Sequence, residues 1–232
     1  MIGVLPNQEI EKLIKIGAIS SDVPIESEQI QPASLDMRLG SKAFRIRASF
    51  LPGNREKVEE RLKSLQMHEI DLRGGAVLEK GCVYLVPLLE VLKLPTDIQA
   101  AANAKSSTGR LDLLTRTISD SGEEFDRISS GYSGKLYAEI CPRSFSVLVR
   151  TGMKLNQIRF RNKNTTLNDE SLKALHAKEK LVPGNAIIDD GLGFSVDLQP
   201  SHGNLVGYRA KPHTGIIDLD LIDHYDPTEF WD

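Results

Sequence analysis

The chain has 232 residues, of which 40% are hydrophobic, so it is long enough to bury the core of one large domain. Its 29 lysines and arginines stand against 32 aspartates and glutamates, a formal net charge of -3. This near balance argues against non-specific nucleic-acid binding, which needs a basic field. No run approaches transmembrane length and the N-terminus has no basic segment, so we expect a cytoplasmic protein that binds neither membrane nor nucleic acid.

Residues that usually hold zinc are few and badly spaced. The two cysteines, Cys82 and Cys141, lie in apolar strand-like runs, which favours buried thiols over a disulfide. No two of the five histidines have a metal-ligand spacing, and no C-x-x-C is present. The sequence therefore predicts that the protein has no zinc site.

The N-terminal third mixes helical and strand patterns. Residues 7–17 predict a short amphipathic helix, with Asn7 as its cap and an apolar face. Residues 30–40 alternate with a period of two, which is typical of a strand. Residues 55–66 are charged at helical spacing and predict a helical insertion on the surface.

Strand signals dominate after residue 66, and turn residues bound most of them. The candidate strands are residues 83–89, 135–141, 145–150, 154–160, 186–188, 194–198 and 216–219. Residues 171–180 predict one surface helix. Many short strands with few helices predict a mostly β fold, either a barrel, a sandwich or a distorted jelly roll with a few short peripheral helices.

The C-terminal end is acidic and aromatic. Residues 218–232 carry Tyr225, Phe230 and Trp231, and such a cluster often docks on another surface. We therefore predict one domain over residues 1–217 and a tail or linker over residues 218–232.

The string Lys-Ser-Ser-Thr-Gly-Arg at residues 105–110 is a candidate anion site. Its small and hydroxyl residues allow a tight turn whose backbone N–H groups can face a phosphate. Lys105 and Arg110 add charge, and arginine offers a bidentate fork. An ordinary polar loop with solvated cations explains the string equally well.

Glu139 is the sharper candidate, because it lies among apolar residues in an expected strand. Exposed glutamate on an edge strand is the more common case. The apolar runs at residues 140–142 and 147–149 favour an interior position instead. A buried carboxylate needs partners or a task, which makes Glu139 a candidate general base.

Two further polar segments are weaker candidates. Residues 208–215 include Tyr208 and Lys211 and could close over phosphates, although a solvated turn explains their composition better. Asp36 fits a structural role, either capping a turn or pairing with an arginine such as Arg38.

Five strings in one order resemble the dCTP deaminase family of the dUTPase-like superfamily. The resemblance runs from about residue 8 to residue 161, is weaker from 162 to 215, and is closest to the N-terminal half of the long two-domain bacterial form. The strings are Gln-Pro-Ala-Ser-Leu-Asp-Met-Arg-Leu-Gly at 31–40, Tyr-Leu-Val-Pro at 84–87, residues 105–110, Gly-Tyr-Ser-Gly through Glu139, and Gly-Met-Lys-Leu-Asn-Gln-Ile at 152–158.

The resemblance implies a dUTPase-like distorted jelly roll and a zinc-independent deamination of dCTP to dUTP and ammonia. Glu139 would be the general base that activates water, with Ser106 and Arg110 beside it. The implied substrate-binding residues are Lys105, Ser107, Thr117, Ser119, Gln157, Tyr208 and Lys211. Mg²⁺ would ride on the triphosphate, and relatives imply a homo-oligomer, a trimer or pseudo-trimer, with sites at subunit interfaces.

One departure keeps alternatives open. Ser129 stands where the family has an aspartate near the sugar, and the preceding loop at residues 120–127 is long. The alternatives are a dUTP diphosphatase and a non-catalytic nucleotide-binding half of a two-domain enzyme. Loss of the aspartate and retention of Glu139 both favour deamination over diphosphate release.

Overall fold

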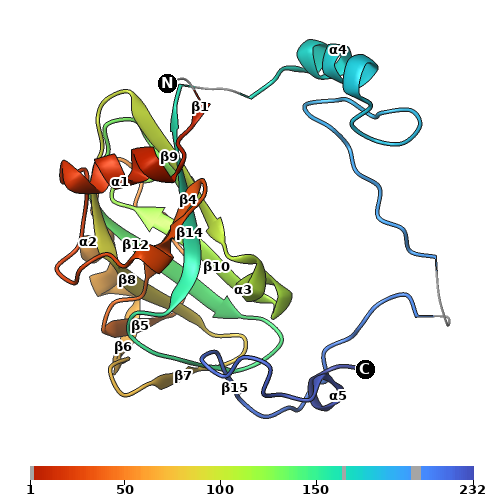
Figure 1. Cartoon of the computed structure of the whole chain (residues 1–232). Helices are drawn as coiled ribbons and strands as arrows, with labels where there is room; N and C mark the ends of the chain where they lie inside the picture. Colours follow the sequence, from red (N-terminus) through yellow and green to blue (C-terminus); the bar gives the residue numbers. More distant parts are fainter. Residues whose placement is uncertain (1–2, 164–165, 200–204) are drawn as a thin grey trace. The chain divides into compact units, whose positions relative to one another are not determined.

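The computed structural model describes residues 3–163, 166–199 and 205–232. The chain divides into two compact units (Figure 1). The first combines Met1–Lys163 with Ala210–Asp232, and the second is Asn164–Arg209. The predicted boundary at residue 217 does not coincide with this division, because residues 210–232 group with the first unit.

Two large sheets and one small sheet form the first unit. The first sheet has the order β11 (Arg127–Ile128), β9 (Ile98–Ala104), β14 (Lys154–Asn162), β4 (Ser34–Arg38) and β3 (Ile30–Gln31), and β1 (Gly3–Val4) also pairs with β14. The second sheet has the order β10 (Leu113–Ser119), β12 (Ser133–Pro142), β8 (Val83–Lys93), β5 (Lys42–Ile46) and β6 (Gln66–Asp71), and β2 (Ile19–Ser20) pairs with β8. The small sheet joins β15 (Ile217–Asp218), β13 (Val147–Val149) and β7 (Ala76–Leu78). The mostly β, jelly-roll-like fold is as predicted.

The first unit also contains short helices. They are α1 (Asn7–Lys15), the 3₁₀ turn η1 (Ser27–Gln29), α2 (Val58–Leu65), α3 (Ser106–Arg110) and α5 (Pro227–Phe230). In Figure 1, α1 lies at one end of the unit, and β7 and β15 lie at the other. The predicted helices at 7–17 and 55–66 are confirmed. Residues 106–110, expected as a turn, form a single helical turn instead.

The main core lies between the inner faces of the sheets. Alternate residues of β12 face inward, and Leu136, Ala138 and Ile140 are fully buried there. The opposite face of β12 is also covered, because α2 packs on it and buries Tyr137 beside Leu85. Glu139 shares the parity of Tyr137, so it lies on this second, covered face.

Aromatic residues join the C-terminal segment to the β unit. Phe145 packs edge-on against Phe230 and Trp231, with ring centroids 5.6 Å and 4.9 Å apart. Phe230 is buried. The predicted aromatic cluster therefore docks on its own chain.

The second unit contains α4 (Asp169–Glu179), which confirms the helix predicted at 171–180. The strands predicted at 186–188 and 194–198 are wrong. Ile188 makes one isolated bridge with Leu192, and residues 194–198 are irregular. Phe194, Val196 and Leu198 alternate as a strand would, yet they are 78%, 80% and 72% exposed. Among residues 166–199 and 205–209 of this unit no strand pairs with them, and alternation alone does not stabilise a strand.

Candidate active site

Glu139 lies in the middle of the second sheet and is 2% exposed. Its strand, β12, runs between β10 and β8, and Glu139 is directly opposite Arg116 of β10. Arg116 Nε donates to Glu139 Oε1 over 3.1 Å, and Arg116 Nη2 also contacts that oxygen. The predicted burial of Glu139 is confirmed, and its charge is balanced by a cross-strand cation.

Arg116 is itself held on two sides. Its guanidinium carbon lies 3.7 Å from the ring centroid of Phe125, a close cation–π contact. Its Nη2 also donates to Ser49 Oγ over 3.0 Å. Both partners come from segments outside the named strands, one from the chain after β5 and one from the loop after β10.

The second carboxylate oxygen of Glu139 has no partner. Glu139 Oε2 is buried, and among the residues that the structure describes no donor contacts it. A buried acceptor without a donor costs free energy of the order of 1–3 kcal/mol. Such an atom is therefore available to a water or a ligand donor.

On the outer edge of β10, the backbone of Thr117 is hydrogen-bonded to Asp126. The Thr117 N–H donates to Asp126 Oδ1 over 2.7 Å, and the Asp126 N–H donates to the Thr117 carbonyl over 2.8 Å. Burial raises the pKa of Asp126, and the nearby charge of Glu139 adds to the effect. Thr117 and Ser119 are both buried, and the Ser119 carbonyl accepts from the Gly122 N–H over 3.1 Å. The main-chain N–H and carbonyl of Thr117, a predicted substrate-binding residue, are thus engaged within the chain.

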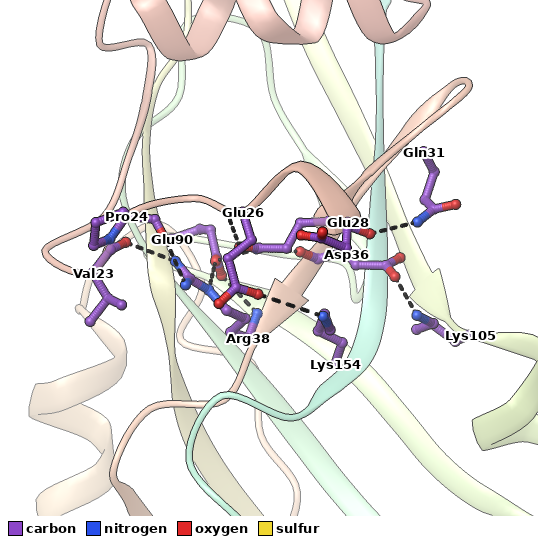
Figure 2. A network of polar contacts seen from close by, with 11 residues as sticks. Val23, Pro24, Glu26, Glu28, Gln31, Asp36, Arg38, Glu90, Lys105 and Lys154 are labelled. Carbon is purple, nitrogen blue, oxygen red and sulfur yellow. Dashed lines mark hydrogen bonds and ion pairs between the residues drawn. The ribbon is translucent and has the colours of Figure 1, made fainter. Parts of the chain in front are cut away.

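Lys105 pairs with Asp36, as Figure 2 shows. A small hollow of about 160 Å³ lies here, lined by Gln31, Asp36, Lys105, Ser106 and Gln157. Ser34 Oγ donates to Gln157 Oε1 over 3.2 Å. The structure therefore brings three predicted residues together, namely Lys105, Ser106 and Gln157. Asp36 pairs with a lysine rather than with the arginine expected.

A larger hollow of about 560 Å³ adjoins the other side of Lys105. It is lined by Ser107 and by two further cations, Arg150 directly after β13 and Lys154 at the start of β14. Arg150 binds the C-terminal segment, with distances of 2.6 Å to Asp218 Oδ1 and 2.7 Å to Asp220 Oδ2. This ion pair lowers the pKa of Asp218 to about 2. Three cations, Lys105, Arg150 and Lys154, therefore line the hollow together with the Asp220 carboxylate.

Arg38, Glu90 and Gln29 form a buried hydrogen-bond network with a structural role. Arg38 Nε donates to Glu90 Oε1 over 2.8 Å, and Gln29 Nε2 donates to the same oxygen over 2.9 Å. Figure 2 shows Arg38 reaching on to the carbonyls of Val23 and Pro24. Each guanidinium nitrogen of Arg38 donates at least one hydrogen bond, so the network holds the N-terminal segment in place.

Ser106, Ser107 and Arg110 lie exposed on α3. The side-chain contacts of Glu139 within the described chain are with Arg116, so Ser106 and Arg110 are not its partners in a single chain. Their place beside Glu139 therefore stays a prediction, which requires α3 of a neighbouring subunit. The cross-strand register puts Arg116 there instead.

The two C-terminal residues predicted to bind phosphate belong to different units. Tyr208 belongs to the second unit and is 71% exposed. Lys211 belongs to the first unit, where its Nζ donates to the Thr228 carbonyl over 2.6 Å and lies 3.6 Å from Asp232 Oδ1. Lys211 thus braces the C-terminal helix α5.

Sequence reasoning missed Arg116, Phe125 and Asp126. Arg116 is the charged residue in the otherwise apolar and hydroxyl-bearing run of residues 113–119, which is the signal that could have marked it. Both cysteines are free thiols; Cys141 is buried, as predicted, whereas Cys82 is only half-buried. Burial raises the pKa of Cys141. Within residues 3–163, 166–199 and 205–232, no group of three or more metal-binding side chains and no membrane-length apolar helix is found.

Comparison with known proteins decides the family. The N-terminal domain of 2'-deoxycytidine 5'-triphosphate deaminase matches residues 1–164, and the C-terminal domain matches residues 168–232. The chain belongs to the dCTP deaminase family. The match covers both family domains, so the prediction that the chain corresponds only to the first half of a long form is too narrow.

Named relatives are consistent with this family. A "dCTP deaminase, dUMP-forming" of Beutenbergia cavernae is 28% identical over 158 residues, covering 68% of this chain and 78% of the relative. A "dCTP deaminase" of Haemophilus influenzae is 32% identical over 143 residues, covering 58% of this chain and 70% of the relative. The crystal structure of the 2'-deoxycytidine 5'-triphosphate deaminase from Agrobacterium tumefaciens is 48% identical with a TM-score of 0.90, over 99% of this chain and 69% of that one.

Proposed function

We propose that this dCTP deaminase family member catalyses the hydrolytic deamination of dCTP to dUTP and ammonia. The observation that carries the proposal is the buried Glu139 carboxylate, with one oxygen bound by Arg116 and the other free to accept a proton. A general base needs a proton-accepting atom within hydrogen-bond reach of the attacking water, and Oε2 is such an atom. The names of the relatives and of the Agrobacterium tumefaciens structure support the choice of dCTP as substrate.

The chemistry needs one proton acceptor that later acts as a donor. Glu139 Oε2 takes a proton from water as the water oxygen bonds to C4 of cytosine, and that proton passes to N3. The second proton of the added water is carried to the exocyclic amine. The C4–N bond then breaks, ammonia leaves, N3 keeps its proton, and the C4 oxygen becomes the uracil carbonyl. The sum is dCTP plus water giving dUTP plus ammonia, with Glu139 restored.

We propose that the triphosphate binds beside Lys105. The hollow lined by Lys105, Ser107, Arg150 and Lys154 offers cations and a hydroxyl to phosphate oxygens. Mg²⁺ would arrive as part of the substrate, bound to the phosphates.

The exposed α3 supports assembly into a homo-oligomer. Ser106 and Arg110 do not touch Glu139 of their own chain, whereas they are free to reach a neighbouring copy. A site completed by α3 of a second subunit, in a trimer or pseudo-trimer, would unite these residues. Ser106 and Arg110 would then bind the attacking water and the developing charge.

A second candidate product is dUMP. The Beutenbergia cavernae relative carries "dUMP-forming" in its name, which is the specific observation in favour. Against it, Ser129 provides no carboxylate where a diphosphatase reaction would call on one.

Product analysis tests these alternatives. The chain would be incubated with dCTP and Mg²⁺, and dCTP, dUTP, dUMP and ammonia would be quantified over time. We expect dUTP and ammonia in equal amounts. Equal dUMP and ammonia from the start would establish the second candidate, and bound but unchanged dCTP would refute both and leave a non-catalytic nucleotide-binding protein.

A further inference from the structure

We propose that Arg116 is a positioning residue for Glu139, and that Phe125 and Ser49 hold it in place for that task. The inference rests on the proposed function, because it assigns a role within the same reaction. It goes beyond that function by adding three residues and two surface segments to the site.

The contact between Arg116 and Glu139 is one-sided. The two Arg116 nitrogens that donate to Glu139, Nε and Nη2, both donate to Oε1, and neither contacts Oε2. A bidentate arginine pair normally places one donor on each carboxylate oxygen. Here the arrangement fixes the rotation of the carboxylate and leaves the lone pairs of Oε2 for the proton of the attacking water.

The clamp on Arg116 is built from two segments that lie outside the strands of the sheets. Ser49 follows β5 in the insertion that carries α2, and Phe125 belongs to the loop of residues 120–127. These two segments are tied to each other, because the Val58 N–H donates to Asp120 Oδ1 over 3.0 Å and the Gly53 N–H donates to the Gly122 carbonyl over 3.1 Å. With a ring 3.7 Å from its guanidinium carbon, Arg116 has little room to swing away from Glu139.

A purely structural ion pair would look similar at first sight. Arg116 and Glu139 link two strands, and their side chains are 30% and 2% exposed. A structural role predicts that replacing Arg116 lowers thermal stability and leaves the turnover of the folded protein unchanged. A positioning role predicts that replacing Arg116 lowers kcat more than it lowers thermal stability. It also predicts that added guanidinium restores kcat.

The decisive experiment is chemical rescue of Arg116→Ala. Turnover of dCTP by the full chain would be measured with and without guanidinium chloride, and with urea at the same concentration as a control for denaturation. We expect kcat to fall about ten- to a hundredfold with KM within about threefold, as for loss of one charge-assisted contact to a catalytic group. Added guanidinium should raise the kcat of Arg116→Ala about tenfold, and urea should not raise it.

Matched variants separate the outcomes. Arg73→Ala removes an arginine that pairs equally closely with a carboxylate, Asp71, at an exposed turn, and it should leave kcat unchanged. Phe125→Ala should lower kcat in the same direction as Arg116→Ala, because the guanidinium is no longer held. Unchanged kcat in Arg116→Ala, or a loss that guanidinium does not restore, would overturn the inference.

A parallel measurement on Glu139→Gln keeps the two claims distinct. If Glu139→Gln is inactive while Arg116→Ala is fully active, the proposed function stands and the positioning role fails. If Glu139→Gln is fully active, the proposed base itself is wrong.

Discussion

Replacing Glu139 by glutamine tests the base most sharply, because the structure predicts what the new side chain does. Glutamine has the same number of heavy atoms, so no cavity forms at this buried position. Its amide oxygen can keep the contact with Arg116 in place of Oε1. The amide NH₂ then occupies the place of Oε2, and the one atom free to accept a proton becomes a donor.

The expected loss follows from the role of Oε2. General-base catalysis typically contributes a factor of about 10²–10⁴, which corresponds to about 2.7–5.5 kcal/mol of transition-state stabilisation. Stability should change less, by about 1–2 kcal/mol, because Arg116 is partly solvated and keeps an acceptor. We therefore expect kcat to fall on the order of a hundredfold or more, while the dissociation constant of dCTP stays within about threefold.

The assay combines initial rates at saturating dCTP with calorimetric titration of the nucleotide. Glu69→Gln is a matched control, since Glu69 pairs with Lys42 over 2.8 Å on an exposed strand. Its kcat should equal that of the parent chain. A Glu139→Gln protein that binds dCTP and turns it over within about threefold of the parent would refute the mechanism.

Three further outcomes are expected. Mixing Glu139→Gln with Arg110→Ala subunits should restore part of the activity that each variant lacks alone, because a site shared between subunits then regains one intact copy; no recovery in a mixed oligomer would contradict the shared site. The stabilising effect of Asp218, whose pKa is lowered to about 2 by Arg150, should be present above the ordinary value of 3.8 and lost as pH falls toward 2. The parent should therefore unfold with a larger free energy than Asp218→Asn at neutral pH, and the difference should vanish in acid titrations; a difference that persists below pH 2 would contradict the assignment. Deamination should continue with a zinc-specific chelator present, and activity that is lost and then restored by added zinc would refute the zinc-independent reaction.

The sequence predicted elements whose pattern is decided locally. The strands at 135–141 and 154–160 carry strong apolar alternation, and both lie in the large sheets. β9 was missed because its run of alanines in residues 100–104 has weak strand propensity. That strand forms because β14 and β11 pair with it on both sides, which is tertiary context that no local window contains.

The opposite error occurred at residues 194–198. Phe194, Val196 and Leu198 have the correct alternation and propensity for a strand, and yet they remain exposed in irregular chain. A strand is stabilised by its neighbours more than by its own residues, so a correct local pattern without a partner gives no sheet.

The candidate site shows the same limit. Glu139 was identifiable, because a carboxylate within an apolar strand is unusual at any position. Its partner was not, because the pairing with Arg116 depends on the register between β10 and β12, and the contact with Phe125 depends on the path of an irregular loop. Sequence reasoning chose Arg110 by resemblance, and the structure puts Arg116 next to the carboxylate.

Isotope labelling tests the central claim most directly. The chain would convert dCTP in water labelled with heavy oxygen, and the products would be analysed by mass spectrometry together with the ammonia released. Our account predicts one labelled oxygen at C4 of the base for each ammonia formed, with no label in the phosphates of dUTP. Label that appears only in a phosphate, on a nucleotide that still carries cytosine, would contradict it.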